Sequence, residues 1–124
     1  MDNTRVEYKV MPEQGIVIAR IYGTDHDAID TFNRKFFANT TSALSVVREY
    51  WNNDNGRFTM PRSFKAIARC HPEDVFDEEK GKKIALNKLS EKYNHSLDKH
   101  LANIMLVLDK TLKNMDEYFE GRTF

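Results

Sequence analysis

The dominant pattern in the sequence is a helical repeat of apolar residues between Asp77 and Phe119. At a rise of ~1.5 Å per residue, a helix over residues 77–120 is roughly 65 Å long, far beyond the ~14 Å radius of gyration of a compact domain of this length. Part of it must therefore project from the domain. The apolar residues recur in steps of three or four, at a mean near ~3.67 that is typical of an almost straight amphipathic helix: Leu89, Tyr93, Leu97, Leu101, Ile104, Leu108, Leu112, Met115 and Phe119.

Around residues 101–108 the helix is apolar on more than this one stripe, because Met105, Leu106 and Val107 point elsewhere. The rest of the chain has too little mass to cover two sides of a helix. The pattern predicts a homo-oligomer, at least a dimer, assembled through Leu97, Leu101, Ile104, Met105, Leu108 and Leu112. In the alternative, the helix is kinked at Asn94–Ser96, and Ser96 caps a second helix that folds back as a hairpin.

Two strands are expected at the N-terminal end. Residues 5–10 alternate strictly, with Val6, Tyr8 and Val10 on one face and charged residues on the other. Residues 11–15 carry the proline and glycine of a turn. Residues 16–22 are apolar on both faces until Arg20, which favours a strand with neighbours on both sides. The prediction is a β-hairpin.

A short helix is expected next, at about residues 25–37. Thr24 with Asp27 resembles a capping box, and Ile29, Phe32 and Phe36 share one face. Residues 41–51 fit a helix or a strand, with a slight preference for helix. A strong turn follows at residues 52–56.

A third strand is predicted over residues 62–71, where Phe64, Ala66, Ala68 and Cys70 share a face whose small alanines allow a helix close to the sheet. The acidic residues between 73 and 79 would cap the long helix, and Gly81 would lie where the sheet excludes a Cβ. The sequence thus predicts one α+β domain, 1–124. Its sheet and short helices occupy residues 1–72: an antiparallel hairpin plus one or two further strands, followed by the long helix over 77–120.

Composition narrows the function classes. Nineteen basic and nineteen acidic residues cancel, which argues against a protein that coats duplex nucleic acid and favours a small anion as ligand. The one cysteine excludes an internal disulfide, and no signal stretch or apolar run of membrane-spanning length is present. A cytoplasmic protein without membrane contact is expected.

The sequence offers no persuasive catalytic or metal centre. Cys70 and His71 are good zinc ligands by type, but neighbours on a strand point to opposite faces. Gly81-Lys82-Lys83 lacks the upstream glycine of a phosphate loop, and no nucleophile signature surrounds Cys70. We therefore expect no enzyme activity, metal or cofactor.

The basic and aromatic segment between Gly56 and His71 contains no acidic residue and is the best candidate for ligand binding. Arginine pairs with phosphate, rings stack on bases, and a helix beginning near Thr41 would offer free amides. Alternatively, the rings belong to the core and the arginines to a solvated rim. The candidate ligand-binding residues are Asn39, Thr40, Thr41, Ser42, Arg48, Trp51, Arg57, Phe58 and Arg62.

The run from Phe64 to Asp77, Phe-Lys-Ala-Ile-Ala-Arg-Cys-His-Pro-Glu-Asp-Val-Phe-Asp, followed by Gly-Lys-Lys-Ile-Ala at 81–85, resembles small phage and prophage proteins of low-GC Gram-positive bacteria. Among these it is most similar to the anti-Thoeris sponge proteins. The resemblance covers roughly the second half of the chain. It implies an oligomeric anti-defence protein that sequesters a cyclic ADP-ribose isomer in the bacterial host cell without degrading it.

Two other functions remain open at the level of sequence. The same arginines would suit a nucleic-acid-binding protein with a larger groove, whose affinity falls steeply with salt. The exposed helix would suit a phage protein that binds a host protein.

Overall fold

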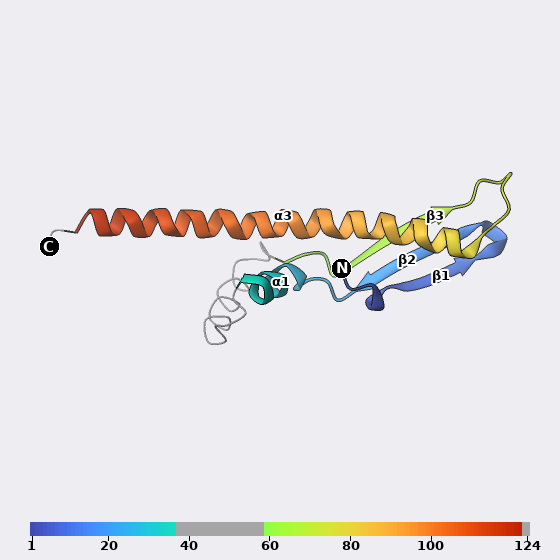
Figure 1. Ribbon diagram of the computed structural model, residues 1–124, viewed down its shortest axis with the longest axis horizontal. Helices are drawn as coiled ribbons and strands as arrows, with labels where there is room; N and C mark the ends of the chain where they lie inside the picture. The colour runs from blue at the N-terminus through green and yellow to red at the C-terminus, as the bar shows by residue number, and fades with distance from the viewer. Residues whose placement is uncertain (37–58, 123–124) are drawn as a thin grey trace.

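The computed structural model describes residues 1–36 and 59–122, which form an α+β fold with a three-stranded antiparallel sheet and one long helix (Figure 1). Residues 41–51, for which helix and strand were both considered, lie outside this part of the chain. The elements are the 3-10 turns η1 (Asn3–Arg5) and η2 (Pro12–Gln14), the strands β1 (Glu7–Met11), β2 (Ile16–Tyr22) and β3 (Ser63–Arg69), and the helices α1 (Asp27–Phe36) and α3 (Glu78–Glu120).

The sheet has the order β1-β2-β3, so the predicted hairpin is confirmed and β2 is the central strand. Gly15 closes the hairpin turn with a φ of 66°, a left-handed conformation that glycine adopts without strain. The alternation of β2 places Val17, Ala19 and Ile21 in the core and leaves the residues between them partly exposed. One face of the central strand is therefore buried along its whole length.

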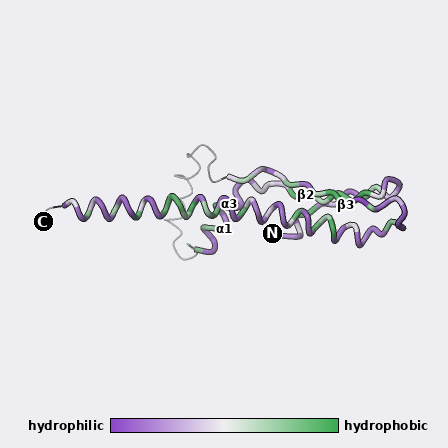
Figure 2. Tube along the Cα trace, turned by 90° about the horizontal axis from the view of Figure 1, so that it is seen from above, coloured by the Kyte–Doolittle hydropathy of each residue, from purple (hydrophilic) through white to green (hydrophobic). Residues whose placement is uncertain are grey.

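The first half of α3 covers that face (Figures 1 and 2). Ala85 and Leu89 of the helix pack on Val17, Ala19, Ile21, Ala66 and Ala68 of the strands. Close approach depends on small residues, as predicted: a Cβ on Gly81 would lie 2.6 Å from Val17 Cγ2. The helix begins as expected, because the Asp77 carboxylate accepts a hydrogen bond from the Lys80 amide at 3.2 Å.

The middle of α3 packs on α1. Ile29 and Phe32 of α1 enclose Ile104 completely, with Leu101, Val107 and Leu108 around them. Two predictions need correction here. Ile104 is 0% exposed within its own chain and is unavailable to another copy, because α1 covers that side of the helix. Phe36 is exposed at the end of α1, its ring 5.3 Å from that of Phe32, although its spacing suggested burial.

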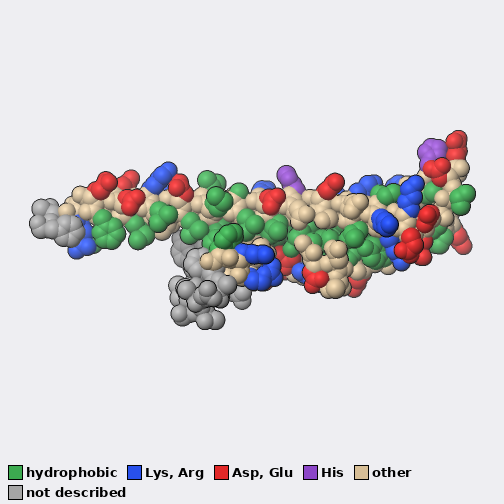
Figure 3. All heavy atoms as spheres, viewed as in Figure 1, with side chains coloured by type: hydrophobic (Ala, Val, Ile, Leu, Met, Phe, Trp, Pro, Cys, Tyr) green, Lys and Arg blue, Asp and Glu red, His purple; other side chains and the backbone are tan. Residues whose placement is uncertain are grey.

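The last part of α3 projects beyond both the sheet and α1 (Figure 1). The helix is continuous from Glu78 to Glu120, so the hairpin alternative with a break at residues 94–96 is wrong. Every residue from 109 to 120 is exposed. We call these twelve residues the tail. Their apolar side chains remain at the surface with acidic side chains beside them (Figure 3).

A polar cluster joins the N-terminus, α1 and α3. Asp27 Oδ2 accepts from Arg5 Nη1 at 3.0 Å and from the Tyr93 hydroxyl at 2.7 Å. Arg5 Nη2 also donates to the carbonyls of Tyr22 and Gly23 at 2.8 and 2.7 Å. Arg5 was expected among the charged residues on the solvent-exposed face of the first strand. It lies in η1 instead, and its guanidinium points toward Asp27. The capping box also fails, because the buried Thr24 hydroxyl donates to the Pro61 carbonyl instead.

This cluster predicts an alkaline loss of stability. Burial, reinforced by the bond to Asp27, raises the pKa of Tyr93 above its ordinary value of 10.0. The folded chain therefore keeps the Tyr93 proton where the unfolded chain releases it, and this contribution is lost as the pH rises above about 10. In urea unfolding between pH 8 and 11.5, Tyr93→Phe should show a shallower fall in unfolding free energy than the unmodified chain. Equal slopes would contradict this role of Tyr93.

Candidate anion-binding groove

Of the nine residues predicted to bind a ligand, Arg62 lies within the described part of the chain. Asn39, Thr40, Thr41, Ser42, Arg48, Trp51, Arg57 and Phe58 lie outside the described residues. Arg62 is exposed just before β3, and its carbonyl accepts hydrogen bonds from the amides of Gly23 and Thr24 at 2.8 and 3.2 Å. Phe64, from the same basic and aromatic segment, packs edge-on against Tyr93 with ring centroids 5.8 Å apart. This ring therefore belongs to the core.

The outer edge of β3 forms a groove with α3 that is lined mainly by basic side chains. Its volume is about 440 Å³, and its charged lining residues are Lys65, Arg69, Lys88, Glu91 and Lys92. Lys65 and Arg69 are exposed on β3, while Lys88 and Lys92 reach across from the helix. Four cations thus surround one acid in a chain whose total charges balance.

Backbone contacts fix the two helix lysines in this groove. Lys88 Nζ donates to the Ile67 carbonyl at 3.2 Å, and Lys92 Nζ donates to the Lys65 carbonyl at 2.9 Å. These contacts also block an unpaired strand edge, a common way to prevent edge-to-edge association. An ammonium has three donors, so each lysine retains N–H groups for an anion. Arg69 adds a guanidinium, which suits two phosphate oxygens at once.

The sequence pattern predicted only one side of this groove. Lys65 and Arg69 were recognised as part of the basic segment, whereas Lys88 and Lys92 were missed. Their spacing of four residues places them on one side of α3, which identifies a basic stripe. That this stripe faces β3 depends on the crossing of the helix over the sheet, which the sequence does not encode locally.

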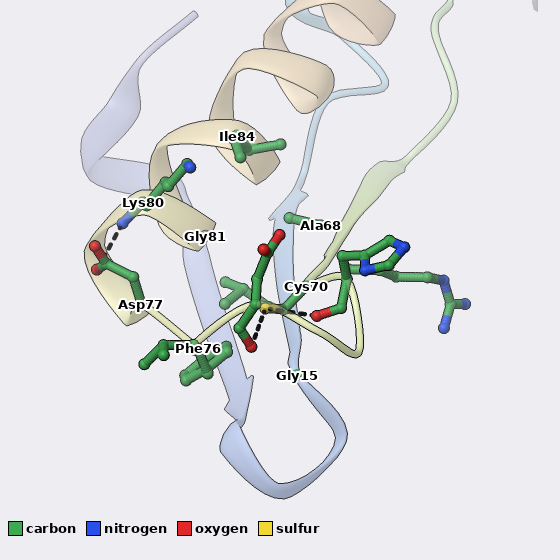
Figure 4. A pocket seen from close by; sticks show the side chains of 13 residues that line it. Gly15, Ala68, Cys70, Phe76, Asp77, Lys80, Gly81 and Ile84 are labelled. Carbon is green, nitrogen blue, oxygen red and sulfur yellow. Dashed lines mark hydrogen bonds between the residues drawn. The ribbon is translucent and has the colours of Figure 1, made fainter.

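A second cavity, of about 380 Å³, lies where β3 leads into α3 (Figure 4). Its polar groups are largely used within the junction. Cys70 Sγ donates to the carbonyls of His71 and Asp74 at 3.4 and 3.7 Å, and Asp77 caps the helix. His71 Nδ1 accepts from the Glu73 amide at 3.3 Å. The thiol and the imidazole therefore each bind a backbone group, and the motif at this junction has a structural explanation.

Over residues 1–36 and 59–122, no group of three or more His, Cys, Asp or Glu side chains is arranged to hold a metal ion. In the same part of the chain, neither helix combines the length and apolar character needed to cross a membrane.

Comparison with known proteins provides no further identification. Neither a protein-family model, nor a curated protein, nor a solved structure matches this chain.

Proposed function

We propose that this protein binds a small phosphate-bearing molecule, of the cyclic ADP-ribose kind, and holds it unchanged within a self-associated assembly. The observation that carries the proposal is the groove at the β3 edge, where Lys65, Arg69, Lys88 and Lys92 surround a single acid, Glu91. A ligand with two phosphates loses much hydration on binding, and several cations replace it.

Self-association is the second part of the proposal. Leu112, Met115 and Phe119 are 61%, 49% and 52% exposed on the tail, and Met105 is 68% exposed one turn before it. Because part of each side chain is already covered, burying the rest would contribute roughly 1–2 kcal/mol for each. A second copy is a suitable partner because other copies of the chain are always present. It would also enclose a groove that a single small protomer leaves open to solvent.

The anti-defence role in an infected bacterial cell follows from the resemblance to sponge proteins and belongs to the same proposal. Because a sponge protein does not degrade its ligand, denaturing the protein should release the ligand intact. The purified protein should therefore be incubated with an extract that contains the defence signal, washed and heat-denatured. An intact nucleotide in the supernatant by mass spectrometry supports sequestration, a processed nucleotide indicates an enzyme, and the absence of a nucleotide favours a macromolecular partner.

The groove makes a residue-level prediction. Lys88→Ala together with Lys92→Ala should weaken binding of cyclic ADP-ribose roughly 100-fold or more, because each of the two charge-assisted hydrogen bonds is worth about 1.5–3 kcal/mol. Isothermal titration calorimetry measures this change. The matched control is Lys83→Ala with Lys110→Ala, which removes the same charge from exposed positions of the same helix.

Two outcomes would redirect the proposal. Unchanged affinity in the Lys88/Lys92 variant, with loss in Arg57→Ala, moves the ligand to the segment predicted from sequence. A steep fall of affinity for single-stranded nucleic acid with salt, spread over several phosphates, replaces the small ligand with a polymer.

A further inference from the structure

The face of the sheet opposite α3 is a second surface that residues 1–36 and 59–122 leave uncovered, and we call it the open face. Along β2, Ile16 and Ile18 alternate with the core residues and remain partly exposed, as do Met11 on β1 and Ile67 on β3. In the strand register Ile18 lies between Lys9 and Ile67, and Ile16 lies between Met11 and Arg69. The centre of the open face is therefore aliphatic.

Basic side chains surround this aliphatic centre. Lys9, Arg20, Lys65 and Arg69 lie on the open face, against one acid, Glu7. Lys65 and Arg69 also line the groove, which adjoins this face at the edge of β3. Arg20 is held in place, since its Nη1 donates to the Tyr22 hydroxyl at 2.9 Å and its guanidinium carbon lies 5.8 Å from the centre of that ring. An apolar centre with a charged rim is the usual anatomy of a protein–protein interface, and the rim selects an acidic partner.

The tail of α3 has the complementary properties. Leu112, Met115 and Phe119 follow one another at steps of three and four and form one stripe. Asp109, Asp116 and Glu120 recur at steps of seven and four, which places a mainly acidic row beside it. Lys113 lies in the same row and pairs with Asp109 at 3.1 Å. Between residues 109 and 120 there are four acids and two lysines. The tail is thus an apolar stripe with an acidic border, matching the apolar centre and basic rim of the open face.

We propose that the tail of one copy docks on the open face of a second copy. The dimensions agree: twelve helical residues span roughly 18 Å, and the seven residues of β2 span roughly 23 Å. Each copy offers both surfaces, so a two-fold rotation lets the two copies exchange tails and closes the pair. Each sheet then lies between its own α3 and the partner's. This inference rests on the proposed self-association and specifies its contact.

Disulfide cross-linking tests the contact. In a Cys70→Ser background, which removes the native thiol, Ile18→Cys places a thiol at the centre of the open face and Met115→Cys places one on the tail. Under mild oxidation, the chain with both substitutions should form covalent dimers, and each single variant should stay largely monomeric on a non-reducing gel. If circular dichroism shows that the Ile18→Cys variant does not fold, Ile67→Cys takes its place.

The control and the outcomes separate the two proposals. Ile84→Cys with Met115→Cys should not cross-link, because Ile84 is exposed on α3 away from the open face. Cross-linking of Met115→Cys alone means that two tails pair with each other and overturns docking on the sheet. Association by sedimentation without any Ile18–Met115 or Ile67–Met115 cross-link also overturns it while preserving self-association. A monomer in sedimentation overturns both.

Discussion

Replacing Leu112, Met115 and Phe119 together with glutamate should convert the assembly into single 14.5 kDa chains that remain folded. The three side chains are exposed in the isolated chain, so the substitutions remove no core contact. Phe119 loses a contact at the helix surface with the ring of Tyr118, whose centroid is 5.4 Å away. In an assembly they would be buried. Losing about 1–2 kcal/mol for each, and introducing unpaired charge, should weaken association more than 100-fold.

Light scattering after size exclusion measures this change, and a matched control isolates its cause. Lys110→Glu with Asn114→Glu adds the same negative charge to the tail, on the side of the helix away from the apolar stripe. This control should associate as the unmodified chain does. Equal loss of association in both variants would assign the effect to net charge, and no loss in either would remove the tail from the interface.

Leu89→Ala should have the largest effect on folding, with a loss of about 2–5 kcal/mol in unfolding free energy. Leu89 is 0% exposed between α3 and the sheet, where its neighbours in the core include three strand alanines, Ala19, Ala66 and Ala68. Such small residues leave no flexible side chain to fill the space that the leucine vacates. The loss is a large fraction of the stability of a domain of this size.

Urea unfolding measures the loss of unfolding free energy in Leu89→Ala, and Leu106→Ala is the control. Leu106 lies on the same helix but is 63% exposed, so the same chemical change there should cost roughly 0.5 kcal/mol or less in a monomeric background. Similar losses at the two positions would mean that α3 does not pack on the sheet through Leu89.

The parts of the fold that depend on local periodicity were predictable. The strict alternation of residues 5–10, the three-and-four spacing along α3 and the small residues Ala66, Ala68 and Gly81 each encode a face. The long helix, the hairpin and the packing of one on the other followed from these patterns. Helix capping by Asp77 was predictable for the same reason, since the cap and the capped amide are three residues apart.

The errors involve contacts between residues distant in sequence. Thr24 has the spacing of a capping residue, yet its hydroxyl donates to Pro61, which is 37 residues away. Ile104 has the character of an interface residue, and amphipathic spacing alone does not reveal that α1 rather than a second copy covers it. The groove combines Lys65 with Lys92, which are 27 residues apart, for the same reason. Periodicity identifies a face but not the element that covers it.

The central claim is that a second copy covers the apolar tail of α3. Sedimentation equilibrium of the unmodified chain tests it most directly, at concentrations from roughly 1 to 100 µM, where association free energies of about 6–8 kcal/mol become visible. We predict a mass of at least twice 14.5 kDa at the upper end of this range. A mass of 14.5 kDa at every concentration would contradict the claim.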